Sequence, residues 1–493
     1  MNGLILRLSP LFFALFLLSS CDGYSLKSPD KNEDQKAERA EQKYNQPSKQ
    51  KNKHSNNNPS KKTNKNQPKN SDRKQTATLL DRGLWRIADP LAVGLDPERL
   101  DDAFDYAVKD GFYTQAVVII KDGKLVKERY RGISSWETKR LSGFVNSGLL
   151  RSLFKRLYAN RNQYSHATSW SVAKSFTGAL IAIAIEQEHI GSFDDPVSNY
   201  IEEWNNVNDT RSHITIRDLL DMRSGLAHFC SDENCQNDNT IALAANQVSA
   251  CVDRQLEIKF LSKTQAHYYY LKGIKPWVYS NCDTMILGEI IHRATGRDLK
   301  DYADRNLFSK IGMKAEWWRD KSDNRANYLA YCCLDATPRD FAKFGQLILN
   351  NGRWDSQQII PESYIKEIKR ISSKSEVKAG GYYGMQFWAF APKNDLNTTV
   401  YYAHGYDGQN IMIDFDNKLV VVRNSLYGRL TDGKDDRVMS MTGLNLDSVN
   451  LDTLNAPLTL PMSFLQKTKT GVGVKSGRFD ERLFFEKVIE SLK

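Results

Sequence analysis

The pattern of apolar and polar residues predicts several helices. Asp96-Pro97 opens a helix that we expect to extend to about Lys109, because aspartate is a good helix cap and proline fits the first helical position. Residues 171–190 hold a long apolar run that predicts a buried helix, which Gly191 ends. The run Thr215-Ile216-Arg217-Asp218 has the pattern of a capping box and predicts another helix start.

Strands are predicted toward both ends of the same region. The segment QAVVIIKDGKLVKERY predicts a β-hairpin, because two β-rich runs flank Asp122-Gly123, a dipeptide typical of tight turns. Three later runs predict sheet strands with turns at Asp407-Gly408 and Asp416-Asn417: NTTVYYAH, QNIMIDFD and KLVVVRNS. A final amphipathic helix is expected from Phe479 onward. Strands at both ends with helices between them predict an α+β fold rather than repeated β-α-β units.

This pattern divides the chain into three parts. We expect a signal peptide, a tether and one folded domain, at residues 1–21, 22–76 and 77–493. Within the folded domain we expect a sheet subdomain from about residues 77–165 and 345–493, interrupted by a helical subdomain from about residues 166–344.

Residues 133–165 are expected to form an insertion between the hairpin and the apolar helix. Their segment GLLRSLFKRLYANR predicts an amphipathic helix with basic residues around one apolar face. Such a helix can lie on a membrane surface or pack against the body of the protein. We favour packing, because six apolar residues make an ordinary core face: Leu149, Leu150, Leu153, Phe154, Leu157 and Tyr158.

The first 21 residues have the pattern of a secretory signal peptide, with one arginine, an apolar run and then small residues. The apolar run is short for a membrane span. Leu18-Ser19-Ser20-Cys21 resembles the bacterial lipoprotein box, which implies cleavage before Cys21 and lipidation of its side chain. An ordinary signal peptide with an incidental cysteine is the alternative. Because of the resemblance to the lipoprotein box, we expect a lipid-anchored protein on the periplasmic, extracytoplasmic side of a bacterial cell envelope.

The positive charge of the chain lies mainly in residues 22–76. The whole chain has a formal net charge of +10, and this segment holds 14 Lys and Arg residues against 7 Asp and Glu residues. It has almost no apolar residues to bury, so we predict a disordered tether. Its charge suits an anionic leaflet or wall polymer, although solubility and reach would explain it equally. No nucleic-acid motif is present, and the export signal argues against such a partner.

Six cysteines follow Cys21, an even number that permits disulfides in an exported protein. Cys230 and Cys235 flank a short polar loop and are our first expected pair. Cys332 and Cys333 are neighbours, and neighbouring cysteines rarely bridge to each other. No C-x-x-C or histidine-rich spacing indicates zinc, so we expect no metal and no other cofactor.

Ser171 and Lys174 are three residues apart and would share one helix face, where the lysine can act as a base for the serine hydroxyl. The same spacing recurs at Ser28, Ser48, Ser71, Ser152, Ser363 and Ser375, so spacing alone decides nothing. Only the Ser171 copy runs on into a long apolar helix. A lysine has an ordinary pKa of about 10.4, which burial or a second partner must lower for it to accept a proton near neutrality. A capping serine and a snorkelling lysine are the plain alternative.

Two further groups could complete such a site. In Tyr279-Ser280-Asn281, the tyrosine could act as a base beside a lysine and then as an acid to the leaving group, and Asn281 could hold lysine and substrate. In Ala403-His404-Gly405-Tyr406-Asp407-Gly408-Gln409, glycines would let a substrate approach backbone N–H groups at the end of a strand. Each group by itself also fits an ordinary turn.

The three groups together resemble, in order and spacing, the motifs of penicillin-binding protein and class C β-lactamase-like serine hydrolases. The flanking segments resemble that family over about residues 90–430, among them ITIRDLLDMRSGL, YSNCDTMILGEIIHRATG and LDATPRDFAKFGQLILNNGRW. The Asp-Thr after the tyrosine motif, and a G-x-x-G-Q turn in place of Lys-Thr-Gly, make the chain most similar to the branch that contains 6-aminohexanoate-dimer hydrolase. The resemblance implies a β-lactamase/transpeptidase-like fold, with an antiparallel sheet flanked by helices and a helical subdomain.

The resemblance also implies catalytic roles. Ser171 would be the acylated nucleophile, Lys174 its base partner and Tyr279 the catalytic tyrosine. The backbone N–H groups of Ser171 and Tyr406 would form the oxyanion hole.

The substrate side of the site is less defined by the resemblance. Asn281 occupies the last position of the tyrosine motif, and Gly405 precedes the expected oxyanion residue. His404 lies where relatives place a basic or bulky residue, and it could match either the lysine of the third motif or the residue after it. A literal Lys-Thr-Gly occurs at residues 469–471, but we reject it because a polar loop, and not a sheet strand, is expected there.

These features together predict a membrane-tethered serine hydrolase that forms an acyl-enzyme on Ser171 and hydrolyses a small ester, amide or peptide-like substrate. A second hypothesis is D-alanyl-D-alanine carboxypeptidase or β-lactamase activity, which the missing Lys-Thr-Gly at the expected turn disfavours. A third is a sensor lipoprotein of the same fold without turnover, which the intact Ser171, Lys174 and Tyr279 disfavour.

Overall fold

The computed structural model describes residues 85–137, 160–227, 241, 244–256, 271–273, 275, 277–322, 327–371, 376–378, 381–392, 398–425 and 479–492. Several sequence-based predictions lie outside these residues: the signal peptide with Cys21, the tether, most of the amphipathic segment of the insertion, the Cys230–Cys235 pair and the sequence at residues 469–471.

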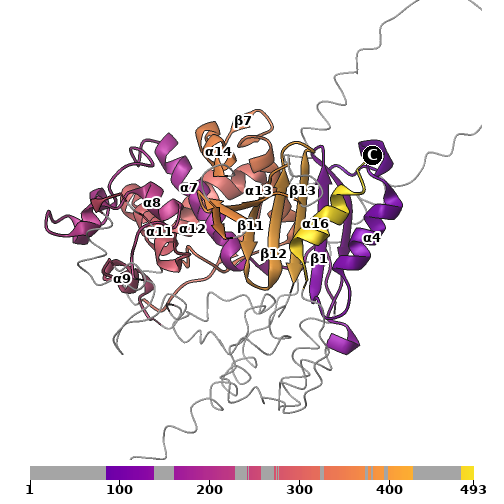
Figure 1. The fold of residues 1–493 in the computed structure, drawn as a ribbon, viewed down its shortest axis with the longest axis horizontal. Helices are drawn as coiled ribbons and strands as arrows, with labels where there is room; N and C mark the ends of the chain where they lie inside the picture. Colours follow the sequence, from indigo (N-terminus) through magenta and orange to yellow (C-terminus); the bar gives the residue numbers. More distant parts are fainter. Residues whose placement is uncertain are drawn as a thin grey trace, which may run out of the picture. The chain divides into compact units, whose positions relative to one another are not determined.

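An eight-stranded sheet forms the centre of the described fold, and all of its neighbouring strands are antiparallel (Figure 1). The strand order is β2-β1-β13-β12-β11-β10-β9-β8. The predicted hairpin is confirmed as β1 (Thr114–Lys121) and β2 (Lys124–Tyr130). Asp122 and Gly123 both have positive φ, 52° and 72°, which the right-handed twist of a two-residue hairpin favours.

The three predicted C-terminal strands are also confirmed. They are β11 (Val400–Gly405), β12 (Gln409–Asp414) and β13 (Leu419–Ser425), and β13 pairs with β1 from the other end of the chain. Three shorter strands complete the sheet: β8 (Glu376–Lys378), β9 (Gly381–Gly384) and β10 (Phe387–Phe390). The sheet therefore joins segments that are about 300 residues apart in the sequence, as the α+β interpretation requires.

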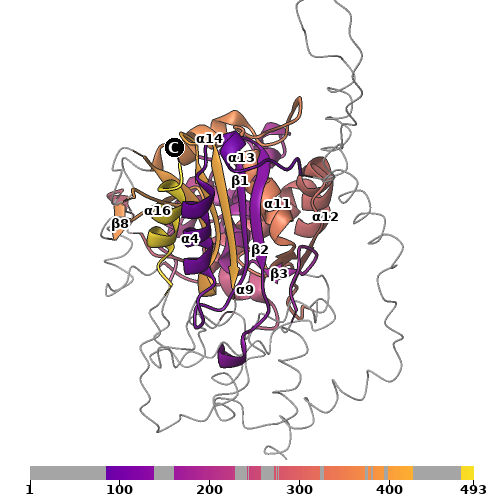
Figure 2. The same cartoon turned by 90° about the vertical axis from the view of Figure 1, so that its right-hand side faces the viewer.

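Both faces of the sheet are covered, which explains why the residues of β1, β12 and β13 are buried almost throughout. Val117 and Ile119 of β1 face a cluster with α4 (Pro97–Ala107) and α16 (Glu481–Ile489), and these two helices lie side by side (Figure 2). Val118 and Ile120 face the opposite cluster, which includes α13 (Pro338–Leu349). The helix cap at Asp96 and the final helix are confirmed as predicted.

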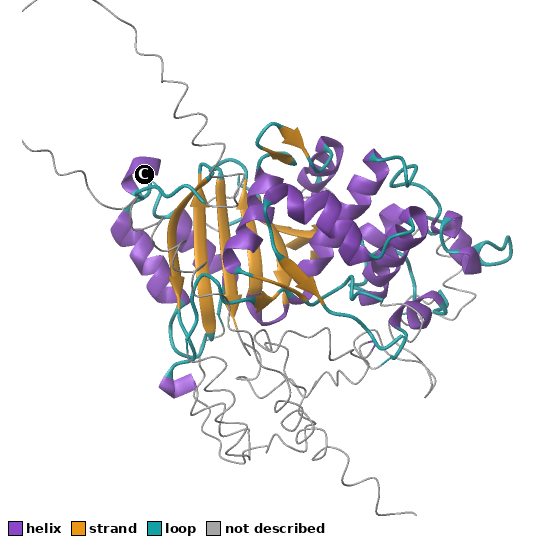
Figure 3. Ribbon diagram, turned by 180° about the vertical axis from the view of Figure 1, so that it is seen from behind, coloured by secondary structure: helices purple, strands orange, loops and turns teal. Residues whose placement is uncertain are grey.

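Within the described residues, the helical part contains, besides α7 (Ala173–Glu186), the helices α8 (Ile216–Leu220), α9 (Gln247–Val252), α11 (Asn281–Thr295) and α12 (Leu299–Ala303). Figure 3 shows these helices beside the strands of the sheet. α11 packs against α7, α8 and α9. The predicted capping box is present, because Thr215 and Asp218 bind each other's backbone N–H groups.

Smaller elements connect the two parts. A three-stranded sheet is formed by β3 (Ala167–Thr168), β5 (Leu334–Ala336) and β4 (Ala315–Trp317), and β6 (Arg353–Trp354) pairs with β7 (Gln357–Gln358) before α14 (Glu362–Lys369). α13 packs on β1, β12 and β13, so the subdomain boundary that we placed between residues 344 and 345 falls inside a helix of the sheet layer.

The apolar helix differs from the prediction at both ends. Residues 170–172 form a 3-10 turn, and the α-helix itself begins at Ala173. It ends at Glu186, before the predicted stop at Gly191, because the chain turns at Glu188, whose φ is 61°. The polar residues after the apolar run leave the core at this turn, so the last apolar residues and not the glycine mark the end.

Two disulfides join described cysteines: Cys251–Cys282 and Cys332–Cys333. Our expectation that neighbouring cysteines would not bridge is therefore wrong for Cys332 and Cys333. Cys333 has a φ of 64°, and this left-handed turn brings the adjacent side chains together. Among the described residues, we find no helix long and apolar enough to span a membrane.

Asp221 gives the fold a testable dependence on pH. Its Oδ1 accepts a hydrogen bond of 2.8 Å from the Met385 N–H, and burial raises the pKa of its carboxyl to about 6. The folded protein then binds this proton more tightly than the unfolded chain, so unfolding free energy falls as pH rises from about 4 to about 6 and changes no further above that.

Asp221→Asn keeps an oxygen for Met385 and removes the charge. We expect the variant to lose this part of the pH dependence and to have a higher Tm than the wild-type protein above about pH 6. Thermal unfolding of both proteins between pH 4 and pH 7 measures the effect, and parallel curves for the two proteins would contradict it.

Candidate active site

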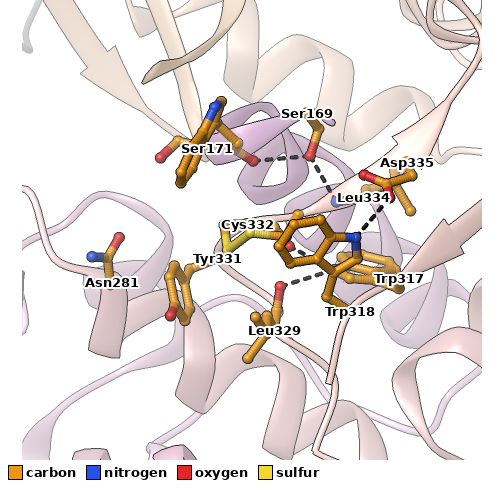
Figure 4. Close-up of a disulfide and its surroundings, with 12 residues drawn as sticks. Ser169, Ser171, Asn281, Trp317, Trp318, Leu329, Tyr331, Cys332, Leu334 and Asp335 are labelled. Carbon is orange, nitrogen blue, oxygen red and sulfur yellow. Dashed lines mark hydrogen bonds between the residues drawn. A yellow bond between two sulfur atoms is a disulfide. The ribbon is translucent and has the colours of Figure 1, made fainter. Parts of the chain in front are cut away.

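Ser171 lies on a tight turn that precedes α7. Trp170 has a φ of 47°, which is unfavourable for a bulky residue and has to be maintained by its surroundings. Ser169 supplies this support: its N–H donates to the Leu334 carbonyl (2.8 Å), and its Oγ accepts from the Leu334 N–H (2.9 Å) while donating to the Trp170 carbonyl (2.9 Å) (Figure 4). The hydrogen bonds between Ser169 and Leu334 thus attach the turn that carries Ser171 to β5.

Lys174 occupies the first turn of α7, and its side chain is buried with 1% of the residue exposed. Among the contacts that the structure describes, its Nζ binds Ser171 Oγ at 3.1 Å, Asn281 Oδ1 at 2.8 Å and the Tyr331 carbonyl at 3.0 Å. A neutral amine has two hydrogens and one lone pair. If both hydrogens go to Asn281 and Tyr331, which can only accept at these atoms, the lone pair faces the Ser171 hydroxyl. This is the orientation that a general base for Ser171 requires.

The start of α11 brings the predicted tyrosine motif to the lysine. Ser280 caps the helix, since its Oγ accepts from the Asp283 N–H at 3.1 Å, and Asn281 is the first helical residue. Two residues earlier, the ring centroid of Tyr279 lies 4.8 Å from Lys174 Nζ. Because α11 packs against α7, residues more than 100 positions apart meet in one site. The three predicted catalytic residues are therefore brought together.

Tyr279 stands against an aromatic group on the sheet. Its ring centroid is 5.5 Å from that of Trp388 on β10 and 5.7 Å from that of Tyr383 on β9. Trp388 also contacts Tyr402 and His404 on β11, at centroid distances of 6.5 Å and 6.4 Å. The partly exposed members of this group, Trp388, Tyr402 and His404, extend an aromatic surface from Tyr279 along the sheet.

Tyr331 was not predicted. Its backbone carbonyl binds Lys174, and its hydroxyl donates to Gln247 Oε1 on α9 at 2.9 Å. Every residue has a backbone carbonyl, so the amino-acid sequence carries no signal for this partner of Lys174.

The end of β11 packs directly on the Ser171 turn. Gly405 has an extended backbone, with a φ of −127°, so conformational freedom does not explain the glycine. The reason is space: a Cβ at this position would overlap the Ser169 carbonyl oxygen and lie 3.0 Å from Trp170 Cβ. Tyr406 follows, and its ring centroid lies 5.5 Å from that of Trp170. Gly405 thus allows the backbone of Tyr406 to approach the turn that carries Ser171.

The turn after Tyr406 is held in place by hydrogen bonds from side chains of β12 and β13. The Gly408 carbonyl accepts from Arg423 Nη1 at 2.9 Å and from Asn410 Nδ2 at 3.1 Å. Arg423 is buried on β13, and its Nη2 donates to the Phe112 carbonyl at 2.8 Å while its Nε donates to Thr114 Oγ1 at 3.0 Å. Sequence patterns gave no indication of this support, because an arginine in a strand is usually read as solvent-facing.

His404 is held by the same asparagine. Its Nδ1 lies 2.7 Å from Asn410 Oδ1. Since the amide nitrogen of Asn410 donates to Gly408, its oxygen is the acceptor, and His404 Nδ1 carries a proton. His404 therefore belongs to the aromatic surface and the Gly408 turn, beside the group of Ser171, Lys174 and Asn281.

The comparison with protein families identifies the fold. Residues 100–437 match the family model described as Beta-lactamase. The chain belongs to this beta-lactamase family. The β-lactamase/transpeptidase-like fold and the family that the sequence motifs predicted are therefore confirmed, and the family is one of serine hydrolases.

Relatives with curated names are distant in sequence. A Salmonella typhimurium protein named "Putative D-alanyl-D-alanine carboxypeptidase" is 23% identical over 233 residues, which cover 46% of this chain and 49% of the relative. An N-acetylmuramyl-L-alanine amidase of Bacillus subtilis is 24% identical over 221 residues, 44% of this chain and 45% of the relative. This beta-lactamase-family chain thus spans about half the length of the curated relatives that it matches.

A solved structure is similar over a larger part of the fold. The "Putative 6-aminohexanoate-dimer hydrolase from Bacillus anthracis" aligns with a TM-score of 0.50 at 24% identity, and the alignment covers 69% of this chain and 81% of that one. At this identity the likeness concerns the fold, and the chemistry has to be argued from the site.

Proposed function

We propose that this protein is a serine hydrolase that forms an acyl-enzyme on Ser171 and hydrolyses an ester or amide. The observation that carries the proposal is the environment of Lys174, whose buried Nζ contacts Ser171 Oγ and two oxygens that can only accept. When this amine is neutral and donates its two hydrogens to Asn281 Oδ1 and the Tyr331 carbonyl, its lone pair faces the Ser171 hydroxyl.

In the proposed first step, Lys174 Nζ takes the proton of the Ser171 hydroxyl while Oγ bonds to the substrate carbonyl carbon. The carbonyl oxygen becomes an oxyanion that accepts hydrogen bonds from the N–H groups of Ser171 and Tyr406. Tyr279, whose ring centroid lies 4.8 Å from Lys174 Nζ, passes the proton of its hydroxyl to the leaving alcohol or amine as the bond between that group and the carbonyl carbon breaks.

The acyl-enzyme is then hydrolysed by water. Tyr279, which has given up its proton, accepts a proton from the attacking water as the water oxygen bonds to the acyl carbon. The bond between the acyl carbon and Ser171 Oγ then breaks, Lys174 returns its proton to Oγ, and the acid is released. The same base, acid and oxyanion donors therefore serve both halves of the reaction, so no further catalytic group is needed.

The turn that follows β11 favours a neutral substrate over a carboxylate-bearing one. His404 directs its protonated Nδ1 to Asn410, and the neighbouring surface is built from the rings of Trp388, Tyr402 and Tyr279. Aromatic rings bind apolar chains well and provide no charge for a carboxylate. A D-alanyl-D-alanine carboxypeptidase remains the second candidate, because a distant relative carries that name.

A panel of substrates distinguishes the ester or amide hydrolase from the D-alanyl-D-alanine carboxypeptidase. We expect the wild-type protein to hydrolyse at least one p-nitrophenyl ester or linear amide, with Ser171→Ala as the blank, and to turn over nitrocefin and D-alanyl-D-alanine peptides at least about 100 times more slowly. Turnover of nitrocefin or release of D-alanine, with no hydrolysis of the other esters and amides of the panel, would instead support the second candidate and contradict the first.

A further inference from the structure

Both disulfides of the described residues lie next to the oxygens that surround Lys174. Cys282 directly follows Asn281, whose Oδ1 accepts from Lys174, and Cys332 directly follows Tyr331, whose carbonyl accepts from Lys174. Figure 4 shows Tyr331 and Cys332 below the turn of Ser171, with Asn281 nearby. Both Asn281 and Tyr331, which accept from the amine of Lys174, therefore precede a disulfide-bonded cysteine directly in the sequence.

The short helix α9 connects the two partners. Cys251 binds Cys282 at the start of α11, and Gln247, four residues earlier on the same helix face, accepts a hydrogen bond from the Tyr331 hydroxyl. Gln247 and Cys251 are both fully buried, with 0% exposed. The Cys251–Cys282 bond thus fixes α9 against α11 and, through Gln247, helps to fix Tyr331.

The Cys332–Cys333 bond restricts the chain on the other side. The Cys332 carbonyl accepts from Trp317 Nε1 at 3.0 Å, and the Cys333 carbonyl accepts from the Trp318 N–H at 3.1 Å. The bonded cysteines and these two contacts leave the peptide after Tyr331 little freedom to rotate. The Tyr331 carbonyl is part of that peptide group. The direction in which it points toward Lys174 therefore depends on the same constraint.

We propose that the Cys251–Cys282 and Cys332–Cys333 disulfides are positioning elements of the active site, and that Lys174 activates Ser171 fully only when both bonds are formed. The inference rests on the proposed function. A dithiol reductant such as dithiothreitol supplies two electrons and two protons to each bond, which becomes two thiols while the reductant becomes a disulfide. Activity would then depend on the oxidised state of cysteines that have no chemical role in the proposed reaction.

The test measures how fast Ser171 reacts with a fluorophosphonate, as a second-order rate constant. We expect reduction of the folded wild-type protein to lower this constant at least about tenfold, because displacements of about 1 Å in a catalytic base cost activity on this scale. Reoxidation should restore it. The rate is normalised to the folded fraction from circular dichroism, so partial unfolding cannot mimic the effect, and alkylation with mass mapping reports the state of each cysteine.

Cysteine variants distinguish the contributions of the two disulfides to the labelling rate. Two double variants each lack one disulfide, Cys251→Ala/Cys282→Ala and Cys332→Ala/Cys333→Ala. Without reductant, each should react with the fluorophosphonate more slowly than the wild-type protein. The variant with all four changes should react at the rate of the reduced wild-type protein, and dithiothreitol should not change that rate. Val421→Ala, a core truncation on β13, controls for lost stability, and its folded fraction should label at the wild-type rate.

Two outcomes overturn the inference and are distinguishable. If reduced, folded protein labels as fast as oxidised protein, the disulfides only stabilise the fold and the proposed function stands. If oxidised wild-type protein does not label at Ser171 at all, the proposed function fails, and the inference fails with it.

Discussion

Replacement of Lys174 with methionine is expected to lower kcat for ester hydrolysis about 1,000-fold, within the range that general acid–base groups contribute. The variant retains a side chain of similar length in the buried site but has no lone pair to take the proton of Ser171. Asn281 Oδ1 and the Tyr331 carbonyl lose a donor, which costs about 1–3 kcal/mol of stability. Steady-state rates at saturating ester, measured well below the Tm of the variant, give the comparison.

Lys343 offers a matched control. It is also a buried lysine, with 6% of the residue exposed, but its Nζ binds Asp340 at 2.7 Å and the Gly312 carbonyl. Lys343→Met should therefore destabilise the protein while kcat changes less than about threefold. If Lys174→Met retained more than a tenth of wild-type kcat, or if both variants lost activity equally, the assignment of Lys174 as the base would be wrong.

Gly405→Ala is expected to lower kcat about 100-fold, which is the cost of losing one oxyanion donor. The added methyl group would overlap the Ser169 carbonyl, so β11 must move away from the Ser171 turn and take the N–H of Tyr406 with it. Overpacking of this kind also costs about 1–3 kcal/mol of stability. kcat and Tm of the variant, measured together, separate the two effects.

Gly345 provides the comparison for this variant. A Cβ there would lie 2.6 Å from Val420 Cγ1, so Gly345→Ala introduces a similar clash between α13 and the sheet. We expect it to lower Tm by a similar amount and to leave kcat within about threefold of wild type. Equal losses of kcat in the two glycine variants would mean that Gly405 matters only for folding.

Elements whose signals are local were predictable from the sequence. The hairpin at Asp122-Gly123, the cap at Asp96 and the capping box at Thr215 depend on residues within a few positions of each other, and the structure has all three. Ser171 and Lys174 were found from two local signals together, a spacing of three residues and the long apolar run that follows them.

Features that depend on distant contacts were not predictable in the same way. The Tyr331 carbonyl reaches Lys174 from 157 residues away, and a carbonyl group leaves no mark in a sequence. The Cys332–Cys333 bond depends on a left-handed turn at Cys333, and Gly405 is required by a backbone that approaches from the Ser169 turn. In each case the cause is a packing arrangement that exists only once the sheet and the helices have assembled.

The account depends above all on Ser171 as the nucleophile, and identification of the residue that a fluorophosphonate modifies tests this most directly. Wild-type protein and Ser171→Ala are exposed to the probe, digested and mapped by mass spectrometry. We predict one adduct in the wild-type protein, on Ser171, and none in Ser171→Ala. An adduct on another residue, or equal labelling of the two proteins, would contradict the account.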